Sequence, residues 1–143
     1  MPPITRMFIK TGFAYVVLGV ALSALWIVHL VWPRYPLFGA LQPTALHLIV
    51  VGWLTQVIFG VALWMFPPWS KHAPRGPGAV NWACYSLLNA GILLRLVAEP
   101  WNTLSPHLEL GSLLVVSAVL QVIAVWLFVA AVWTRVRSKH GGR

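Results

Sequence analysis

Four stretches of the chain are long enough and apolar enough to cross a lipid bilayer, and no other feature constrains the fold as strongly. About 20 consecutive apolar residues are needed to span roughly 30 Å of hydrocarbon. The predicted spans cover approximately residues 11–32, 44–66, 79–98 and 107–133. A backbone in hydrocarbon must satisfy its own hydrogen bonds, which a helix does within one segment. The sequence therefore predicts an all-α integral membrane protein, a four-transmembrane-helix bundle that forms a single domain over residues 1–143.

The composition supports this class and excludes others. Of the 143 residues, 59% are hydrophobic and only 8% are charged, whereas a soluble domain is about one-quarter charged. The formal charge is +8, but the basic residues lie at the ends of the apolar runs rather than in a stripe, so we expect no nucleic-acid partner. Membrane lipid is the expected surrounding. Cys84 is the single cysteine, which excludes an internal disulfide and a Cys-paired metal site.

The segments between the spans are short and rich in proline, which stops helices because it lacks the N–H group. No segment is long enough to form another domain. The prolines that separate the spans are Pro33 and Pro36, then Pro67, Pro68, Pro74 and Pro77, then Pro100 and Pro106.

Basic residues predict the orientation, because cytoplasmic segments carry an excess of Lys and Arg. The opposite side holds Arg34 and Arg95 with both acids of the chain, Glu99 and Glu109. We therefore expect both termini to be cytoplasmic. The residues that mark the cytoplasmic side are Arg6, Lys10, Lys71, Arg75, Arg135, Arg137, Lys139 and Arg143.

Three histidines lie at the outer ends of three different spans, at similar predicted depth: His29, His47 and His107. An ionisable side chain in or near hydrocarbon needs a partner and is usually functional. Histidine is a frequent ligand of haem iron and copper, so all three are candidate metal ligands. The alternative for each is a hydrogen bond to a carbonyl or an interfacial position. His72 and His140 lie in basic, hydrated stretches, and we expect them to be surface residues.

The helix that begins near His47 has two distinct faces. One stripe of small and polar residues, Gly52, Gln56 and Gly60, suits the close approach of another helix. On the fourth span, Gly111 follows His107 by one turn and leaves room for a ring. The face below His47 continues as an apolar wall that suits a porphyrin, formed by Val51, Leu54 and Ile58.

Arg95 also needs a partner within the third span. Glu99 follows it at i+4, the spacing of a neutralising ion pair on a helix. Alternatively, Arg95 or Arg34 binds a haem propionate, because a guanidinium group matches a carboxylate bidentately. The sequence leaves these two interpretations open.

These residues resemble the second helix of subunit I of haem–copper oxidases and nitric oxide reductases. The resemblance covers roughly residues 46–95, and its continuation is similar to the NnrS family of haem- and copper-containing membrane proteins. It implies that His47 ligates haem b near the outer face. The matching residues are His47, Gly52, Trp53, Gly60, Met65, Phe66 and Pro67, followed by Pro68, Trp69, Gly91 and Arg95.

The chain departs from that family in size and in its histidines. Subunit I has twelve helices in three arcs, and this chain has the helices of one arc. No position matches the family's second haem ligand, so His107 or a histidine of another copy would have to serve. We therefore expect a homo-oligomer, with a trimer favoured and a dimer as the alternative, since cyclic assembly from one unit is physically reasonable.

The resulting expectation is a haem b-binding protein of a prokaryotic cytoplasmic (inner) membrane. Its role would be electron transfer in a respiratory-type system, with quinol or a redox protein as partner. Any catalysis would be that of an oxidoreductase acting as an oligomer, and no catalytic residue is identified. One alternative is a non-catalytic accessory subunit that packs through Gly52, Gly60 and Gly111. Another is a copper protein that uses His29, His47 and His107, to which Glu109 could add a carboxylate.

Overall fold

The computed structural model describes residues 1–66, 78–133 and 135–136, and these residues form helices and short connections without strands. Four helices are long and apolar enough to cross a membrane, as the sequence predicts. The second of these helices runs without a break from Gln42 to Met65. It is divided into three elements because its middle part is a π-helix. The elements are α1 (Pro3–Val31), α2 (Pro36–Gly39), α3 (Gln42–His47), the π-helix η1 (Leu48–Thr55), α4 (Gln56–Met65), α5 (Gly78–Leu104) and α6 (Leu108–Trp133).

Two helices extend beyond the predicted spans. α1 begins at Pro3 rather than near residue 11, because a proline at the first helical position has the right φ and loses no hydrogen bond. α5 continues through Pro100 to Leu104 instead of ending near residue 98. Proline is tolerated inside membrane helices when neighbouring groups satisfy the freed backbone atoms. α4 ends at Met65, while Pro67 and Pro68, which we expected to close this span, lie outside the described residues.

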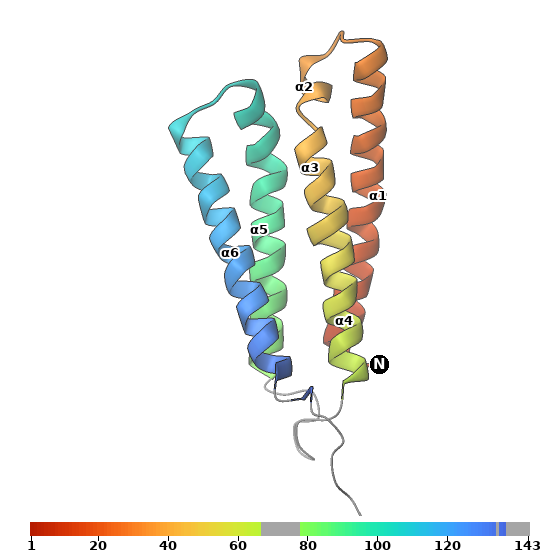
Figure 1. Cartoon of the computed structure of the whole chain (residues 1–143), viewed down its shortest axis with the longest axis vertical. Coiled ribbons are helices and arrows are strands. Elements are labelled where there is room, and N and C mark those ends of the chain that lie inside the picture. The colour runs from red at the N-terminus through yellow and green to blue at the C-terminus, as the bar shows by residue number, and fades with distance from the viewer. Residues whose placement is uncertain (67–77, 134, 137–143) are drawn as a thin grey trace, which may run out of the picture.

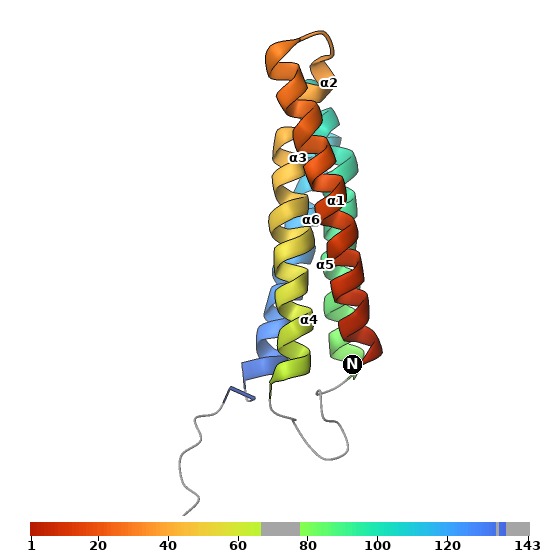
Figure 2. The same cartoon turned by 90° about the vertical axis from the view of Figure 1, so that its right-hand side faces the viewer.

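The helices form two hairpins that stand side by side (Figure 1). α1 packs along α3, η1 and α4, and α5 packs along α6. The start of α1 and the ends of α4 and α6 lie at the same end of the bundle, which we call the terminal end (Figures 1 and 2). α2 and the turn between α5 and α6 lie at the opposite end, which we call the far end (Figure 1).

Glycines allow the helices of each hairpin to approach closely. A Cβ atom on Gly52 would lie 2.9 Å from Tyr15 Cβ, and one on Gly60 would lie 2.9 Å from Phe8 Cβ. The Gly52 stripe is therefore a packing surface against α1 of the same chain, and it is not free to bind another subunit. In the second hairpin, a Cβ atom on Gly91 would lie 2.8 Å from Gln121 Cγ.

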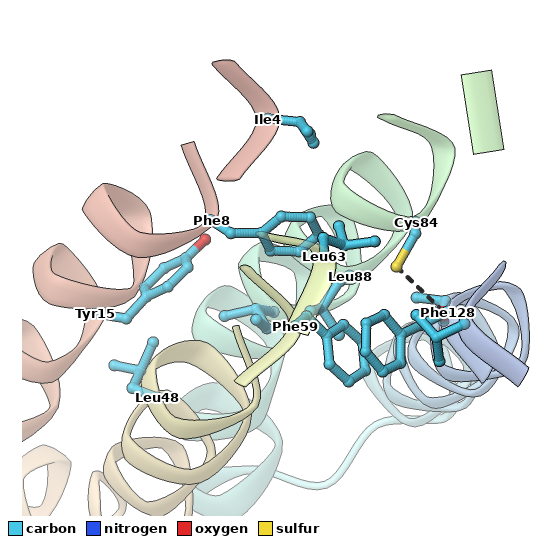
Figure 3. Packing of buried hydrophobic residues seen from close by; sticks show 12 residues of the cluster. Ile4, Phe8, Tyr15, Leu48, Phe59, Leu63, Cys84, Leu88 and Phe128 are labelled. Carbon is cyan, nitrogen blue, oxygen red and sulfur yellow. Dashed lines mark hydrogen bonds between the residues drawn. The ribbon is translucent and has the colours of Figure 1, made fainter. Parts of the chain in front are cut away.

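The two hairpins share a small aromatic and aliphatic core (Figure 3). Phe59 of α4 stacks on Phe128 of α6 with ring centroids 3.7 Å apart and an interplanar angle of 4°. Phe8 of α1 meets Tyr85 of α5 edge to face at 5.1 Å. Cys84 is buried, and its Sγ donates to the carbonyl oxygen of Ala124 (3.3 Å).

Polar contacts at half depth also connect the hairpins. Asn89 Oδ1 on α5 accepts from the Tyr15 hydroxyl (3.0 Å) and from Gln56 Nε2 (3.1 Å). The hydroxyl groups of Thr11 and Tyr85 lie 2.7 Å apart. A polar group in hydrocarbon is costly unless it is hydrogen-bonded, so this network favours the one alignment of α1, α4 and α5 that satisfies its members.

Arg135 closes the terminal end of the bundle. Its guanidinium Nη2 donates to the carbonyl oxygens of Leu63 (3.2 Å) and Phe66 (2.8 Å) at the end of α4. These carbonyls belong to the last turn of a helix, where intrahelical partners run out. Arg135, which follows the second hairpin, therefore caps the end of α4 in the first hairpin.

Substitution of two glycines by alanine should change stability in opposite directions. Gly52→Ala places a methyl group against Tyr15, and we expect it to lower the free energy of unfolding by about 1–3 kcal/mol. Gly111 has open space around its Cβ position, so Gly111→Ala should raise stability by up to about 1 kcal/mol through helix propensity. Unfolding in mixed detergent micelles, followed by circular dichroism, measures both. Equal effects at the two positions would contradict the packing described for α1.

Candidate functional site

His47 lies where the second span changes from an α-helix to a π-helix. α3 ends at His47 and η1 begins at Leu48. Within η1 the Thr55 hydroxyl donates to the carbonyl oxygen of Val50, five residues earlier (3.0 Å). Single π turns are frequent at functional sites because they redirect side chains without ending the helix. The regular helical periodicity assumed from the sequence therefore does not hold directly below His47.

The three residues predicted to form an apolar wall below His47 are at least partly exposed, and because η1 changes the helical periodicity, their position on the face of His47 remains a prediction. Leu54 and Ile58 are 47% and 53% exposed, and Val51 is half-buried. Such a surface suits contact with lipid, a flat apolar ligand or another subunit.

The imidazole of His47 is oriented through its Nδ1 atom. Nδ1 lies 2.8 Å from the carbonyl oxygen of Pro43 and 3.5 Å from Glu99 Oε2. Both neighbours are acceptors, so Nδ1 carries a proton, and in the neutral imidazole the lone pair is then on Nε2. No residue in the described part of the chain hydrogen-bonds Nε2. The His47 side chain is 35% exposed.

Glu99 of α5 is the centre of the polar cluster at the far end. Its side chain is only 10% exposed. Thr44 Oγ1 donates to Oε2 (3.0 Å), and Arg95 Nη1 donates to Oε1 (2.9 Å). With His47 beside Oε2, the carboxylate has partners on both of its oxygens and on both hairpins. A buried carboxylate is tolerated because it is paired and hydrogen-bonded in this way.

The ion pair between Arg95 and Glu99 is thus present at the spacing expected from the sequence. Arg95 Nε is buried and lacks a hydrogen-bond partner among the described residues. The guanidinium group therefore has donor capacity beyond Glu99. Binding of a haem propionate by Arg95 remains a prediction.

The other predicted ligands lie in separate surroundings. The Nε2 of His29 is 2.8 Å from the Cβ position of Gly39 in α2, and its Nδ1 is buried without a hydrogen-bond partner in the described ranges. His107 is exposed on the turn before α6, where Nε2 lies 3.1 Å from Ser105 Oγ. Arg34 is exposed between α1 and α2.

The described residues hold no group of three or more His, Cys, Asp or Glu side chains that could bind one metal ion. Within a single chain, His29, His47 and His107 are therefore not gathered as the copper hypothesis expects. A haem iron needs one histidine from this set, so the haem hypothesis does not depend on such a group.

Two members of the cluster were missed or misread in the sequence. Thr44 was not considered, and Glu99 was considered only as the i+4 partner of Arg95. The available signal was the polar Thr44, three residues before His47 in an otherwise apolar run. Pairing it with Glu99 requires knowing that α3 packs on α5.

The arrangement can hold and tune a metal-binding imidazole. A histidine ligand usually donates its second ring N–H to a carbonyl or carboxylate, which fixes the ring and raises its basicity. Pro43 and Glu99 occupy these positions around Nδ1.

Comparison of the chain with family models, with curated proteins and with solved structures finds no significant match.

Removal of Glu99 should destabilise the bundle more than removal of the whole ion pair. Glu99→Leu leaves Arg95 buried without its counterion, and we expect a loss of roughly 3 kcal/mol in the free energy of unfolding. In the double variant Arg95→Met/Glu99→Leu no charge is left unpaired, so most of this loss should be recovered. The free energy of unfolding of the unaltered protein, of Glu99→Leu and of the double variant is measured in mixed detergent micelles. If the double variant were less stable than Glu99→Leu, Arg95 would not be the main partner of the Glu99 carboxylate.

Proposed function

We propose that the chain binds haem b through His47 and takes part in electron transfer within a membrane. The observation that carries the proposal is the orientation of the imidazole. Its Nδ1 is engaged by the Pro43 carbonyl oxygen and faces Glu99, while Nε2 has no hydrogen-bond partner among the described residues and the side chain is 35% exposed. This is the arrangement that an axial histidine needs before the metal binds.

The surrounding residues fit the same group. The apolar face formed by Val51, Leu54 and Ile58 lies on the same span as His47, on its terminal side. Arg95, whose Nε has no described partner, and Arg34 are the candidates for the propionates. When bound, haem would supply one-electron redox chemistry, since histidine-ligated iron changes its oxidation state within the protein.

The roles of the chain's own residues follow from their contacts. His47 would ligate the iron, and Pro43 and Glu99 would hold its ring in one tautomer. Thr44 and Arg95 would keep the Glu99 carboxylate in place. No second axial ligand is assigned within the chain, and His107 or a histidine of another copy is the candidate.

We further propose that the protein lies in the cytoplasmic (inner) membrane of a prokaryote with both termini in the cytoplasm. The terminal end would then be cytoplasmic and His47 would lie near the outer face. Quinol or a redox protein would be the electron partner, and any catalysis would be that of an oxidoreductase in the assembled oligomer. The distribution of Lys and Arg in the sequence supports this orientation.

The absorption spectrum of the purified protein tests haem binding. After reduction with dithionite we expect the α-band of a b-type haem, and His47→Ala should lose at least about tenfold in haem occupancy, since loss of even an outer-shell partner of a metal ligand typically costs about 10–100-fold. The matched control is His72→Ala, which changes a histidine predicted to lie at the surface. Full haem in His47→Ala would remove this residue from the role.

Two further outcomes separate the alternatives. Copper in stoichiometric amount without haem, found by elemental analysis, would replace the haem proposal with the copper one. A stable protein free of both, isolated only with other subunits, would favour the accessory role. Gly52 and Gly60 are occupied by α1, so of the three glycines only Gly111 would remain for such contacts.

Assembly and orientation have their own measurements. We expect the detergent-solubilised protein to have the mass of three copies, because one chain has the helix content of one arc of the family it resembles. The mass of two copies would support the prediction of a homo-oligomer but would contradict the threefold arrangement. Alkaline phosphatase fused after residue 143 should be inactive if the C-terminus is cytoplasmic, and an active fusion would reverse the orientation.

A further inference from the structure

The π-helix η1 lies between two polar contacts that join the second span to α5. On the side of the far end, Thr44 Oγ1 donates to Glu99 Oε2 (3.0 Å). On the side of the terminal end, Gln56 Nε2 donates to Asn89 Oδ1 (3.1 Å). We call these the far contact and the half-depth contact. The side chains of Thr44 and Gln56 are buried, so both must point toward the helix that holds their acceptors.

A regular α-helix would not place both donors on the same side. Thr44 and Gln56 are twelve positions apart, and each α-helical residue turns by about 100°, so their directions would differ by about 120°. A π turn closes its hydrogen bonds over five residues instead of four and so holds one residue more. One residue taken up in this way reduces the angle to about 20°. The π-helix over Leu48–Thr55 thus aligns two contacts that a plain α-helix would separate.

The two sides of η1 are held in different ways. α4 is fixed by the stack of Phe59 on Phe128 and by Arg135, which donates to two carbonyl oxygens at the end of α4. α3 is held against α5 by the far contact at the Glu99 carboxylate. If the contacts with Glu99 are lost, α3 is therefore the side of η1 that turns.

We propose that η1 is a conformational device that sets the direction of His47. When Glu99 no longer holds α3, the π turn converts to the commoner α-helix, and α3 turns by about 100° relative to α4. The imidazole turns with α3, because its Nδ1 contact with the Pro43 carbonyl oxygen lies within that helix. A change at Glu99 is thereby transmitted to the side of the second span on which His47 lies. The proposal does not rest on haem binding, since it concerns the direction of the side chain and not what it binds.

Distances between spin labels, measured by pulsed electron paramagnetic resonance on the full chain in detergent, test the conversion. The test pair joins Leu46 of α3 to Val119 of α6, and the control pair joins Ile58 of α4 to the same Val119. All three positions are exposed. Each is changed to cysteine in a Cys84→Ala background, because Cys84 is the single cysteine of the chain.

Two variants release α3 from α5. Arg95→Met/Glu99→Leu removes the carboxylate together with its counterion. Thr44→Val/His47→Leu removes the partners of the carboxylate on the second span and leaves the ion pair in place. In each variant the distance of the test pair should change by about 4 Å or more, because a side chain on a helix about 10–12 Å wide travels roughly 8 Å in a turn of 100°. The distance of the control pair should stay unchanged.

Deletion of Val50 from η1 is the matched control. It removes the residue that the π turn takes up, so a plain α-helix then keeps both contacts aligned. Combined with Arg95→Met/Glu99→Leu, the deletion should leave the test pair at its distance in the unaltered protein. Deletion of Val61 from α4, where no extra residue is taken up, should lower the unfolding midpoint more than deletion of Val50.

Three results would overturn the proposal. An unchanged test pair in both released variants, with helicity preserved, would show that α3 keeps its direction without Glu99. A changed test pair that persists after deletion of Val50 would indicate loosened packing without conversion of η1. Loss of stability on deletion of Val50 as large as that on deletion of Val61 would show that η1 holds no extra residue.

Discussion

The carboxylate of Glu99 is the constraint on which the far end of the molecule depends. A carboxylate with 10% exposure cannot remain charged in apolar surroundings unless it is paired and hydrogen-bonded. Its partners come from both hairpins, with Thr44 and His47 on the second span and Arg95 on its own helix. The contacts that Thr44 and His47 make with the Glu99 carboxylate therefore hold α3 against α5. The same contacts set the position and tautomer of the imidazole on which the proposed function depends.

Polar contacts join the hairpins at each level of the bundle. Glu99 acts at the far end, Asn89 at half depth and Arg135 at the terminal end. In a lipid environment, helix association lacks the hydrophobic drive that operates in water, and close packing and hydrogen bonds replace it. The stacked rings of Phe59 and Phe128 and the buried glycines supply that packing.

Some of the local arrangement could be predicted from residue spacing, and some could not. The Arg95–Glu99 pair follows from its i, i+4 spacing, and the packing role of Gly52 follows from the stripe of small residues on its helix; both are found. The contacts of Glu99 with Thr44 and His47 were not foreseen, because they form only between two hairpins. Nor was η1, since the stretch from Leu48 to Thr55 carries no proline and its composition does not distinguish a π turn from an α turn. The separate surroundings of His29 and His107 also depend on loop geometry that spacing along a helix does not define.

The sequence by itself determined the fold class and the four membrane-length helices, because length and hydropathy act locally along each segment. It also restricted the candidate ligands to a few histidines, since so few polar groups occur within the apolar runs. The tertiary structure decided which of them has an oriented ring. His47 is held by a carbonyl of its own helix and by a carboxylate 52 residues away in sequence. That second contact exists only after the hairpins pack, because the cost of burying Glu99 is offset by partners that no single helix provides.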